Sequence, residues 1–233
     1  MKIRVHTRFH LIALTGLLLM LAVTASAEQD VRPGINRAFA DPDWQQWVDR
    51  FERPGREVYD RRDAIVDATC VAPGMTVADI GAGTGLFTRL FARRVGPHGR
   101  VYAVDISRSF VDNIVRASEE SGITNVVGVV DSARNVFLPA NSIDVAFVAD
   151  TYHHFEYPRS MLASIRNALH DDGKMIVIDF RRDPRVNSDW VMGHVRAGRE
   201  TVIEEIEAAG FKLVEEKPLL RSNYYLEFRK SGS

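Results

Sequence analysis

The stretch that decides the fold of this chain reads Val77-Ala78-Asp79-Ile80-Gly81-Ala82-Gly83-Thr84-Gly85. An apolar run leads into an acid, and glycines then occupy every second position. Such glycines allow positive φ and let a ligand approach the backbone closely, and the free N–H groups of a helix that follows favour a negative group on that ligand. The pattern therefore predicts a buried strand that enters a tight ligand-binding loop and a helix.

The spacing of the glycines separates two classes of cofactor. A dinucleotide-binding loop has the pattern Gly-x-Gly-x-x-Gly, whereas the third glycine here comes one residue early, at Gly85, and Leu86 takes the place of the last glycine. Asp79 is a second departure, because a carboxylate at the strand end suits a ligand with a positive group better than a pyrophosphate. The pattern Asp-x-Gly-x-Gly-x-Gly resembles the first motif of the class I S-adenosylmethionine-dependent methyltransferases.

Two further acids follow in the order expected for that family. Residues 100–104 read as a short strand ending in Asp105, which lies 24 residues after Gly81, where a nucleotide-binding α/β fold places the carboxylate that holds ribose hydroxyls. Residues 125–130 read as a third strand that ends in Asp131, and the resemblance implies that this acid accepts from the adenine amino group. Taken singly, both acids could also be turn residues, where Asp is common. The cofactor-binding residues implied by the resemblance are Asp79, Gly81, Ala82, Gly83, Gly85, Asp105, Ile106, Asp131, Ser132 and Asp150.

The rest of the chain alternates between predicted strands and helices. Residues 142–150 resemble the fourth strand of the family and its exit, residues 169–174 the turn that follows a helix, and residues 175–180 the next strand. Helices are predicted over 85–95, 107–120, 158–169 and 196–209, and closing strands over 211–216 and 224–229. Alternation of this kind implies a parallel sheet covered on both faces. We therefore expect an α/β, doubly wound, Rossmann-like seven-stranded sheet, mostly parallel with an antiparallel C-terminal strand, plus an N-terminal helical cap.

The N-terminus reads as a separate segment. Lys2, Arg4 and Arg8 precede an apolar run over 11–23, and the small-residue sequence Ala25-Ser26-Ala27 follows. This is the pattern of a secretory signal peptide, and it predicts an exported, periplasmic protein; an uncleaved membrane anchor is the alternative. The expected organisation is a signal peptide over 1–27, a helical cap over 28–69 and a methyltransferase domain over 70–233. Within the cap, helices are predicted over 41–51 and 58–68.

Composition limits the partners of this chain of 233 residues. Loss of residues 1–27 removes three basic residues and no acid, which leaves 27 basic and 31 acidic residues and a formal charge of −4. That balance argues against a nucleic-acid partner held through phosphate contacts. Cys70 is the only cysteine, so no intrachain disulfide can form, and we expect it to be a small buried packing residue. The expected partner is a small-molecule methyl acceptor, with no stable membrane span after signal cleavage; the oligomeric state stays open.

Candidate catalytic residues follow the fourth predicted strand, in Asp150-Thr151-Tyr152-His153-His154-Phe155. Histidine titrates near neutrality, so His154, and after it His153, are the candidates for a general base. Adjacent residues are not expected to point into one pocket together, and Tyr152 is expected to line the cofactor pocket. The stretch resembles that of small-molecule methyltransferases of the quinone-biosynthesis type, in which the histidine region is often structural.

Two polar clusters and a metal site are the other candidates. The first cluster holds Glu52, Arg53, Arg56 and Tyr59 and the second holds His194 and Arg196, and either suits an acceptor or a solvated loop. Asp150 and Asp179 end adjacent predicted strands, as in magnesium-dependent catechol-type methyltransferases. In that family a third ligand, often Asn, follows the second acid, but here Phe180 follows. No metal is therefore expected.

The leading hypothesis is a methyltransferase that uses S-adenosylmethionine to methylate an oxygen or carbon of a small molecule. One alternative is an exported binding or sensor protein that keeps the fold without methyl transfer. Another is an NAD-linked oxidoreductase, which Leu86 and Asp79 disfavour.

Overall fold

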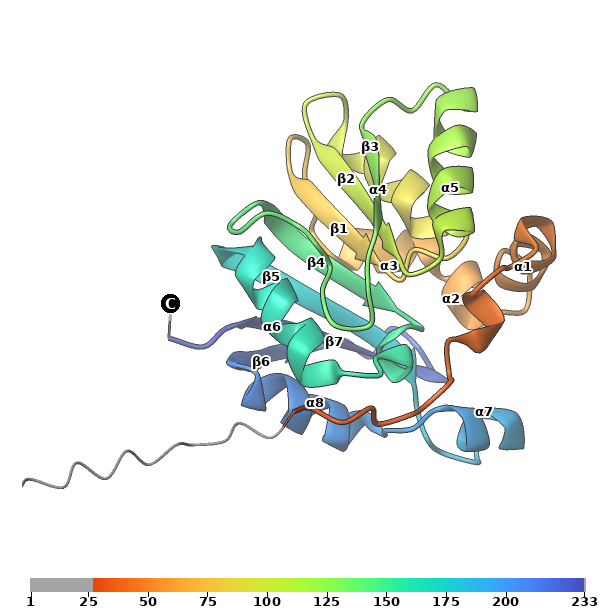
Figure 1. Ribbon diagram of the computed structural model, residues 1–233, viewed down its shortest axis with the longest axis vertical. Coiled ribbons are helices and arrows are strands. Elements are labelled where there is room, and N and C mark those ends of the chain that lie inside the picture. Colours follow the sequence, from red (N-terminus) through yellow and green to blue (C-terminus); the bar gives the residue numbers. More distant parts are fainter. Residues whose placement is uncertain (1–26, 233) are drawn as a thin grey trace, which may run out of the picture.

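The computed structural model describes residues 27–232 (Figure 1). The predicted signal peptide therefore lies almost entirely outside the described residues. Within 27–232, no helix has both the length and the apolar character that a membrane crossing needs.

One seven-stranded sheet forms the centre of the molecule, with the strand order β3-β2-β1-β4-β5-β7-β6. Strands β1 to β5 run parallel to one another, whereas β7 runs antiparallel to both β5 and β6. This arrangement confirms the predicted fold class. The strands are β1 (Thr76–Ile80), β2 (Arg100–Asp105), β3 (Val126–Val130), β4 (Ile143–Ala149), β5 (Leu169–Phe180), β6 (Phe211–Glu216) and β7 (Asn223–Lys230).

Helices cover both faces of this sheet (Figure 1). Several begin where the sequence supplies a capping side chain: Asp43 accepts from the backbone N–H of Gln46, and Ser107 from that of Phe110, as expected at helix N-termini. The α-helices are α1 (Trp44–Phe51), α2 (Glu57–Asp60), α3 (Arg62–Ala68), α4 (Leu86–Val95), α5 (Arg108–Glu120), α6 (Pro158–Ala168), α7 (Asp189–His194) and α8 (Arg199–Ala208), and the 3₁₀ helices are η1 (Arg37–Phe39) and η2 (Tyr152–His154).

Alternating side chains of the central strands supply two hydrophobic cores. On β4, Ala146 and Val148 belong to the core shared with α6 and α8, whereas Val145 and Phe147 belong to the core shared with α3 and α4. This period of two is the geometry of a strand buried on both faces. The ring of Phe147 lies 4.9 Å from that of Phe91 on α4. Both cores end at the carboxyl edge of the parallel strands, where loops with polar residues follow.

Four local predictions were wrong. Residues 169–174 do not form a free turn, because Leu169 already pairs with Ile143 and a bulge then brings Lys174 opposite Val145, so that β5 begins at Leu169. The last helix begins at Arg199 rather than at residue 196, after Gly198 in an extended conformation. The helix expected over 58–68 is divided at Arg61 into α2 and α3. Cys70 is exposed and does not pack in the core; it follows α3 with φ +54°, in the left-handed position that commonly ends helices.

The N-terminal segment crosses to the carboxyl edge of the sheet before it forms α1 and α2 (Figure 1). The backbone N–H of Val31 donates to the carbonyl of Glu156 at 2.9 Å. The Asn36 side chain donates to the carbonyl of His154 at 3.1 Å. The segment is thereby fixed against the loop after β4, and the helices it carries cover the ends of the strands.

Gly128 on β3 gives a test of how closely α5 packs on the sheet. A Cβ at this position would lie 2.6 Å from Val111 Cγ1 and 2.8 Å from Val115 Cγ2. Overpacking of this kind costs about 1–3 kcal/mol, so Gly128→Ala should lower the free energy of unfolding in urea by about that amount.

Gly193→Ala on α7 is the matched control, because a Cβ there meets nothing within 4 Å. It should leave stability unchanged or raise it by up to about 1 kcal/mol. A Gly128→Ala variant as stable as the parent protein would contradict the packing described for α5.

Candidate active site

A pocket of about 640 Å³ lies at the carboxyl edge of the parallel strands. Its walls come from the loop between β1 and α4, the residues that follow β2, β3 and β4, the N-terminal segment with α1, and α7. This is the edge at which open α/β sheets bind their ligands. The ten residues that the sequence assigned to the cofactor lie in or directly beside this pocket.

The loop after β1 depends on its glycines. Gly81, Gly83 and Gly85 have φ of +69°, +55° and +76°, in the left-handed region that side chains with a Cβ avoid. A Cβ at Gly81 would also lie 2.1 Å from Thr151 Cγ2. The loop can therefore lie against the end of β4 only with glycine at position 81.

Asp79 is buried beneath this loop. Its carboxylate accepts a hydrogen bond from the Thr88 hydroxyl at 2.6 Å, which joins the end of β1 to the first turns of α4. Burial, opposed in part by that hydrogen bond, raises the pKa of Asp79 to about 7. The side chain is thus a buried acid whose charge a cationic group in the pocket would stabilise.

Asp105 holds the glycine loop from the neighbouring strand. Its Oδ2 accepts from the backbone N–H of Gly83 and its Oδ1 from that of Ser107, both at 2.8 Å. Burial, opposed by these two hydrogen bonds, raises its pKa to about 6. Each carboxylate oxygen keeps lone-pair capacity for a further donor, so Asp105 can orient the loop and still accept from ligand hydroxyls.

Asp131 differs from the other acids because its carboxylate has no hydrogen-bond donor among the described residues. Its Oδ1 is shielded from solvent and accepts no hydrogen bond within the described part of the chain. Burial and the nearby charge of Asp105 raise its pKa to about 8. Ile106 and Ser132 line the pocket beside it. A buried acceptor without a donor is costly, and a ligand amino group in the pocket would supply the missing hydrogen bond.

Asp150 lies at the pocket wall, but the protein itself occupies both of its oxygens. Arg56 Nη2 donates to Oδ2 at 2.5 Å, and Asn223 Nδ2 donates to Oδ1 at 2.6 Å. The residue has φ +49° and a buried side chain whose pKa burial raises, against the opposing effect of Arg56. These partners fix α2 and β7 to the end of β4, so the structure gives Asp150 an organising role beside its place at the pocket wall.

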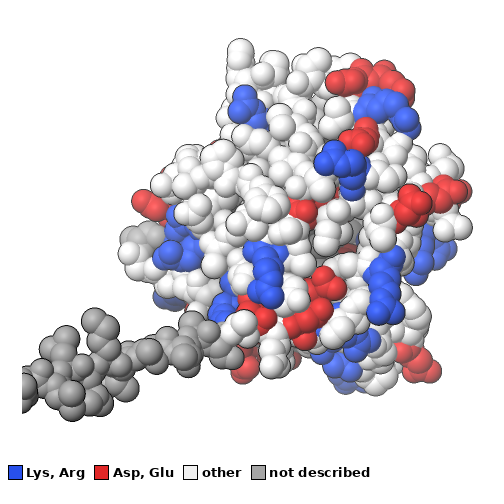
Figure 2. Space-filling model, in the orientation of Figure 1, with Lys and Arg blue, Asp and Glu red and all other residues white. Residues whose placement is uncertain are grey.

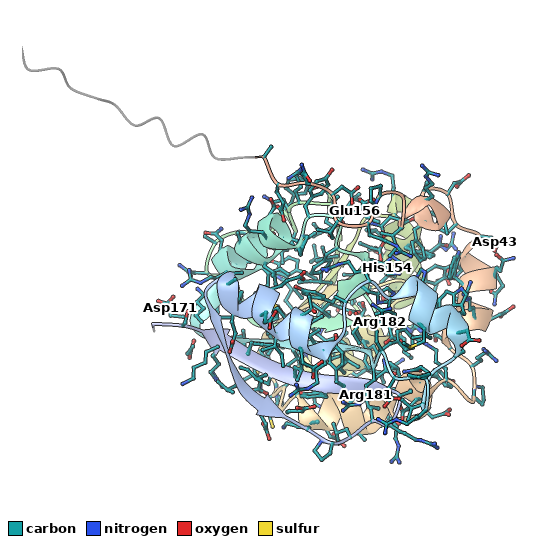
Figure 3. All side chains as sticks on the ribbon, turned by 90° about the horizontal axis from the view of Figure 1, so that it is seen from below. Asp43, His154, Glu156, Asp171, Arg181 and Arg182 are labelled. Carbon is teal, nitrogen blue, oxygen red and sulfur yellow. The ribbon has the colours of Figure 1, made fainter. Side chains whose placement is uncertain are left out.

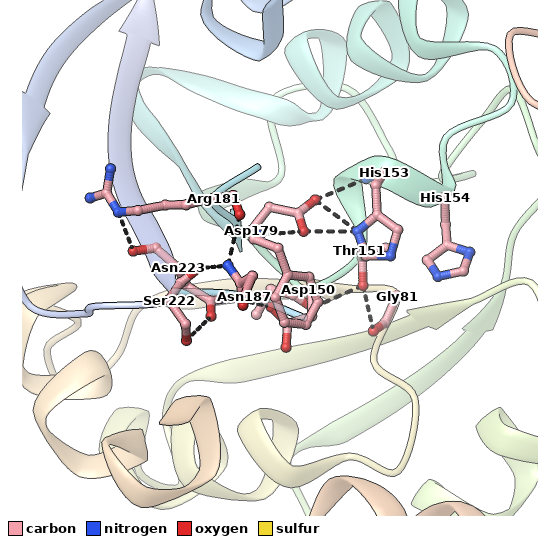
Figure 4. A network of polar contacts seen from close by, with 12 residues as sticks. Gly81, Asp150, Thr151, His153, His154, Asp179, Arg181, Asn187, Ser222 and Asn223 are labelled. Carbon is pink, nitrogen blue, oxygen red and sulfur yellow. Dashed lines mark hydrogen bonds and ion pairs between the residues drawn. The ribbon is translucent and has the colours of Figure 1, made fainter. Parts of the chain in front are cut away.

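His153 is held by Asp179 of β5. Its backbone N–H donates to Asp179 Oδ2 at 2.9 Å, and its Nδ1 lies 2.8 Å from Oδ1. Figure 4 shows Asp179 on one side of His153 and the ring of His154 on the other. With Asp150 bound to Arg56 and Asp179 bound to His153, the pair of acids considered for magnesium is engaged by protein groups.

His154 lies beside His153, with ring centroids 4.3 Å apart, and both rings line the pocket. The expectation that only one of them would do so was wrong, because the tight turn of η2 places the two rings next to each other. His154 is half-buried and lies next to His194 of α7 (Figure 3). Burial, with the neighbouring histidines, lowers the pKa of His154 to about 2, so its ring is neutral at pH 7.

His194 approaches the same two rings from α7. Its centroid lies 5.1 Å from that of His153 and 5.2 Å from that of His154, and its ring stacks on Trp190 at 4.4 Å. Burial lowers its pKa to about 4. The sequence named His194 only as a possible acceptor contact, and no local pattern joins it to residues 40 positions earlier.

Aromatic side chains form a further wall of the pocket, and one of them, Phe51, lies next to Gly83 of the glycine loop. Phe39 and Phe51 both contact Trp47, with ring centroids 4.8 and 4.9 Å apart, and Phe110 of α5 completes the group. Sequence reasoning placed Trp47 and Phe51 on one face of a helix but did not identify Asn36, Phe39 or Trp190 as pocket residues. These residues are far along the chain from the strand ends, and no sequence pattern indicates that they reach the pocket.

The remaining predicted residues divide between the pocket and other roles. Arg53 and Arg56 line the pocket, while Glu52 binds Arg89 through both carboxylate oxygens, at 2.8 and 2.7 Å. Tyr152 was expected to line the cofactor pocket, but it is fully buried and donates to Glu205 at 2.8 Å. Arg196 also binds Glu205 and so faces away from the pocket. On the face in Figure 2, basic and acidic residues are interspersed without a continuous patch of either sign.

Asp131 should make the stability of the ligand-free protein depend on pH. Its pKa of about 8 lies above the ordinary 3.8, so between these values the folded state holds a proton that the unfolded state has released. The resulting stabilisation is complete below about pH 4 and is lost as the pH rises towards 8. Asp131→Asn removes this pH dependence, because asparagine does not titrate. The free energy of unfolding of the variant, relative to that of the parent protein, should therefore be higher at pH 8 than at pH 5 by at least about 1 kcal/mol, or about 2–4 °C in Tm.

Thermal unfolding without ligand at the two pH values measures this difference. Asp171→Asn is the control, because Asp171 is 87% exposed and lies away from the pocket (Figure 3). An equal advantage of Asp131→Asn at pH 5 and pH 8 would show that the carboxyl at position 131 does not carry a raised pKa.

Comparisons with known proteins agree with this geometry. Residues 78–177 match the family model described as a methyltransferase domain. A ubiquinone/menaquinone biosynthesis C-methyltransferase, UbiE, of Bordetella parapertussis is 33% identical over 117 residues, which are 50% of this chain and 45% of that protein. The corresponding enzyme of Cupriavidus metallidurans is 31% identical over 112 residues, 48% of this chain and 46% of that protein. The chain thus matches about half the length of these relatives.

Solved structures resemble a larger part of the chain. A SAM-dependent methyltransferase from Aquifex aeolicus has a TM-score of 0.72 at 22% identity, and the match covers 81% of this chain and 98% of that one. At this identity the likeness shows the fold. The matched family model describes residues 78–177 as a methyltransferase domain, and the fold is that of SAM-dependent methyltransferases. Together these findings imply S-adenosylmethionine as the cofactor.

Proposed function

We propose that this protein is a methyltransferase that transfers the methyl group of S-adenosylmethionine to a small-molecule acceptor. The observation that carries the proposal is the buried Asp131 Oδ1, which lacks a donor in a pocket that also contains Asp105 and the glycine loop. An adenine amino group at Asp131 and ribose hydroxyls at Asp105 would satisfy the acceptors that the protein leaves available.

The residues present fit each part of the cofactor. Gly81 and Gly83 present no side chain to the methionine end, and the buried Asp79 lies beneath the loop, where a positive charge favours the ionised carboxyl. Ile106 lies beside Asp105, with 37% of its surface exposed, and offers an apolar surface to a base. When bound, the cofactor supplies an activated methyl group, so the protein's own contribution is to align the acceptor and exclude water.

The aromatic wall indicates the class of acceptor. Phe39, Trp47 and Phe51 from the N-terminal segment and Trp190 from α7 line the pocket. We assign the part of the pocket between these rings to the acceptor and call it the acceptor half. Flat aromatic molecules pack well on such rings. The similarity to C-methyltransferases of quinone biosynthesis supports an aromatic ring that carries oxygen substituents, methylated at carbon or at oxygen.

His153 and His154, which follow β4, are not equally suited to act as a general base. A general base works best when its pKa lies near the operating pH, and the pKa of about 2 for His154 makes that ring a weak proton acceptor. His153 is oriented by the carboxylate of Asp179 at 2.8 Å, as general-base histidines commonly are. If a base acts here, His153 suits that role better than His154, which reverses the order expected from the sequence.

Calorimetry with S-adenosylhomocysteine and, separately, with NAD tests the cofactor. Binding of the former at micromolar Kd and no binding of NAD are expected. Asp105→Asn removes a charge-assisted acceptor worth about 1.5–3 kcal/mol and should weaken binding about 10–100-fold, whereas Asp171→Asn, on the exposed end of β5, should bind normally.

Other results of this calorimetry would support other functions. Binding of NAD in place of S-adenosylhomocysteine would favour an oxidoreductase. Tight binding without turnover of any aromatic acceptor would favour the sensor hypothesis. Absence of binding to either ligand would refute the enzymatic proposal.

We also propose that the protein is exported, with cleavage after Ala27. The contacts of Glu28 support cleavage at this bond. Its carboxylate accepts from the backbone N–H of Arg159 at 2.7 Å and from that of Ser160 at 2.9 Å. These are N–H groups of the first turn of α6, so residue 28 already belongs to the folded body. Expression in a bacterium with a general secretion system should yield a protein in the periplasm whose mass corresponds to a start at Glu28.

The matched control for export is Leu17→Arg, which places a charge in the apolar run over 11–23 and should leave the uncut chain inside the cell. If the exported protein has a mass that still includes residues 1–27, this result would instead support an uncleaved anchor.

A further inference from the structure

Three histidines from separate parts of the chain meet at one side of the pocket. Each of His153, His154 and His194 offers a ring nitrogen, and these three nitrogens lie within 4.8 Å of one another. The first two belong to η2 and the third to α7. Histidine is the most common side-chain ligand of transition metals, so three imidazoles gathered in this way can form a metal site.

The contacts of His153 leave one nitrogen available in a defined orientation. Its Nδ1 lies 2.8 Å from Asp179 Oδ1, and Asp179 also fixes the backbone of His153 at 2.9 Å. A carboxylate can only accept, so Nδ1 carries the proton and Nε2 carries the lone pair. A carboxylate behind a histidine in this manner is the usual second-shell arrangement of metal-binding histidines, since it orients the ring and increases its basicity.

His154 has an equivalent partner. Asn36 Nδ2 donates to the carbonyl of His154 at 3.1 Å, which leaves Asn36 Oδ1 to accept from His154 Nδ1, also at 3.1 Å. The proton of this ring is therefore on Nδ1 as well, and its lone pair is on Nε2. The two adjacent histidines thus share one tautomer, fixed by groups from β5 and from the N-terminal segment.

His194 completes the group without a competing hydrogen bond. Its ring nitrogens have no hydrogen-bond partner among residues 27–232, and stacking on Trp190, with an interplanar angle of 17°, holds the ring. A tetrahedral zinc ion with Zn–N bonds of about 2.0–2.1 Å places its ligand nitrogens about 3.3 Å apart. The rings would therefore have to close by at most about 1.5 Å, which side-chain rotation and a small shift of the short α7 can supply.

We propose that His153, His154 and His194 bind a divalent transition metal such as Zn²⁺, with an open coordination position that faces the pocket. Three protein ligands and one open position are the arrangement of catalytic rather than structural zinc sites. All three rings line the pocket that contains the glycine loop, so a ligand in the acceptor half would reach the open position. The nitrogen-rich set favours zinc, copper, nickel or iron over magnesium or calcium.

The metal also defines the acceptor more narrowly, and this step rests on the proposed methyltransferase function. An acceptor with a hydroxyl or carbonyl oxygen would coordinate through that oxygen and be held beside the cofactor half of the pocket. A bound metal occupies the lone pair of His153, so metal binding and general-base catalysis by this histidine exclude each other. The proposal therefore makes the histidines ligands that position the acceptor.

Metal binding by the full-length protein, purified without an affinity tag, tests the site directly. Calorimetry with Zn²⁺ should show one ion per chain at micromolar Kd or tighter, and Co²⁺ should give the strong visible absorption of a four-coordinate site. Asp179→Asn should weaken zinc binding about 10–100-fold, the usual effect of losing a second-shell partner, and His194→Ala should weaken it further. His98→Ala is the control, because His98 is exposed in the loop between α4 and β2.

His194→Cys keeps a metal ligand at position 194 and gives a specific signal. If residue 194 coordinates the metal, the Co²⁺ form of this variant should gain a thiolate-to-cobalt charge-transfer band in the near ultraviolet. Equal zinc affinity in the parent protein and His194→Ala, no saturable binding in the parent protein, or no such band in His194→Cys would each overturn the proposal.

Calorimetry with S-adenosylhomocysteine separates this inference from the proposed function. Normal binding by His194→Ala would show that the variant is folded and that only the metal site is lost. If the parent protein binds zinc but not S-adenosylhomocysteine, the proposed function fails while the metal site stands.

Discussion

Burial of carboxyl groups at one edge of the sheet organises this molecule. Each parallel strand ends in or near an acid, so the topology gathers five of them where the cores stop: Asp79, Asp105, Asp131, Asp150 and Asp179. A buried carboxylate needs compensating hydrogen bonds or charges, and four of the five receive them from a threonine hydroxyl, from loop N–H groups, from an arginine with an asparagine, and from a histidine. The fifth, Asp131, is left for a ligand, and this difference points to where the cofactor binds.

The same demand for partners attaches the parts that are not in the sheet. Arg56 neutralises Asp150 and thereby positions α2, and Asn223 brings β7 to the same group. Asn36 joins the N-terminal segment to His154 through two hydrogen bonds. The cap is therefore more than a lid of aromatic rings, since its polar residues complete the ends of β4 and β5. A loss of one partner would leave a buried charge, which is more costly than the loss of the contact itself.

The glycine loop and the acids that the structure gathers at one pocket could be predicted from the sequence, because short backbone patterns encode them. The glycines from Gly81 to Gly85 and the acids that end successive strands occur at spacings set by the length of a strand and a helix. Element boundaries were harder where tertiary contacts decide them: β5 begins early because a bulge absorbs the turn after α6, and α2 and α3 divide at Arg61 without a breaking residue. Tyr152 shows the limit for side chains, since the partner that draws it inwards, Glu205, lies 53 residues away.

The side of the pocket with the histidines and aromatic rings is assembled from segments that lie far apart in the chain. For this reason the sequence did not reveal it. It is assembled from η2, the N-terminal segment and α7, whose contacts join residues separated by 118 positions in the case of Asn36 and His154. No spacing rule connects such residues, because each reaches the site through a loop of unconstrained length. The conserved geometry of a fold fixes where a cofactor lies, while loops carry the residues that select the second substrate. In this protein the same loops bring together three imidazoles with two of their tautomers already fixed, so the feature that distinguishes its chemistry lies in the part of the structure that only the folded chain displays.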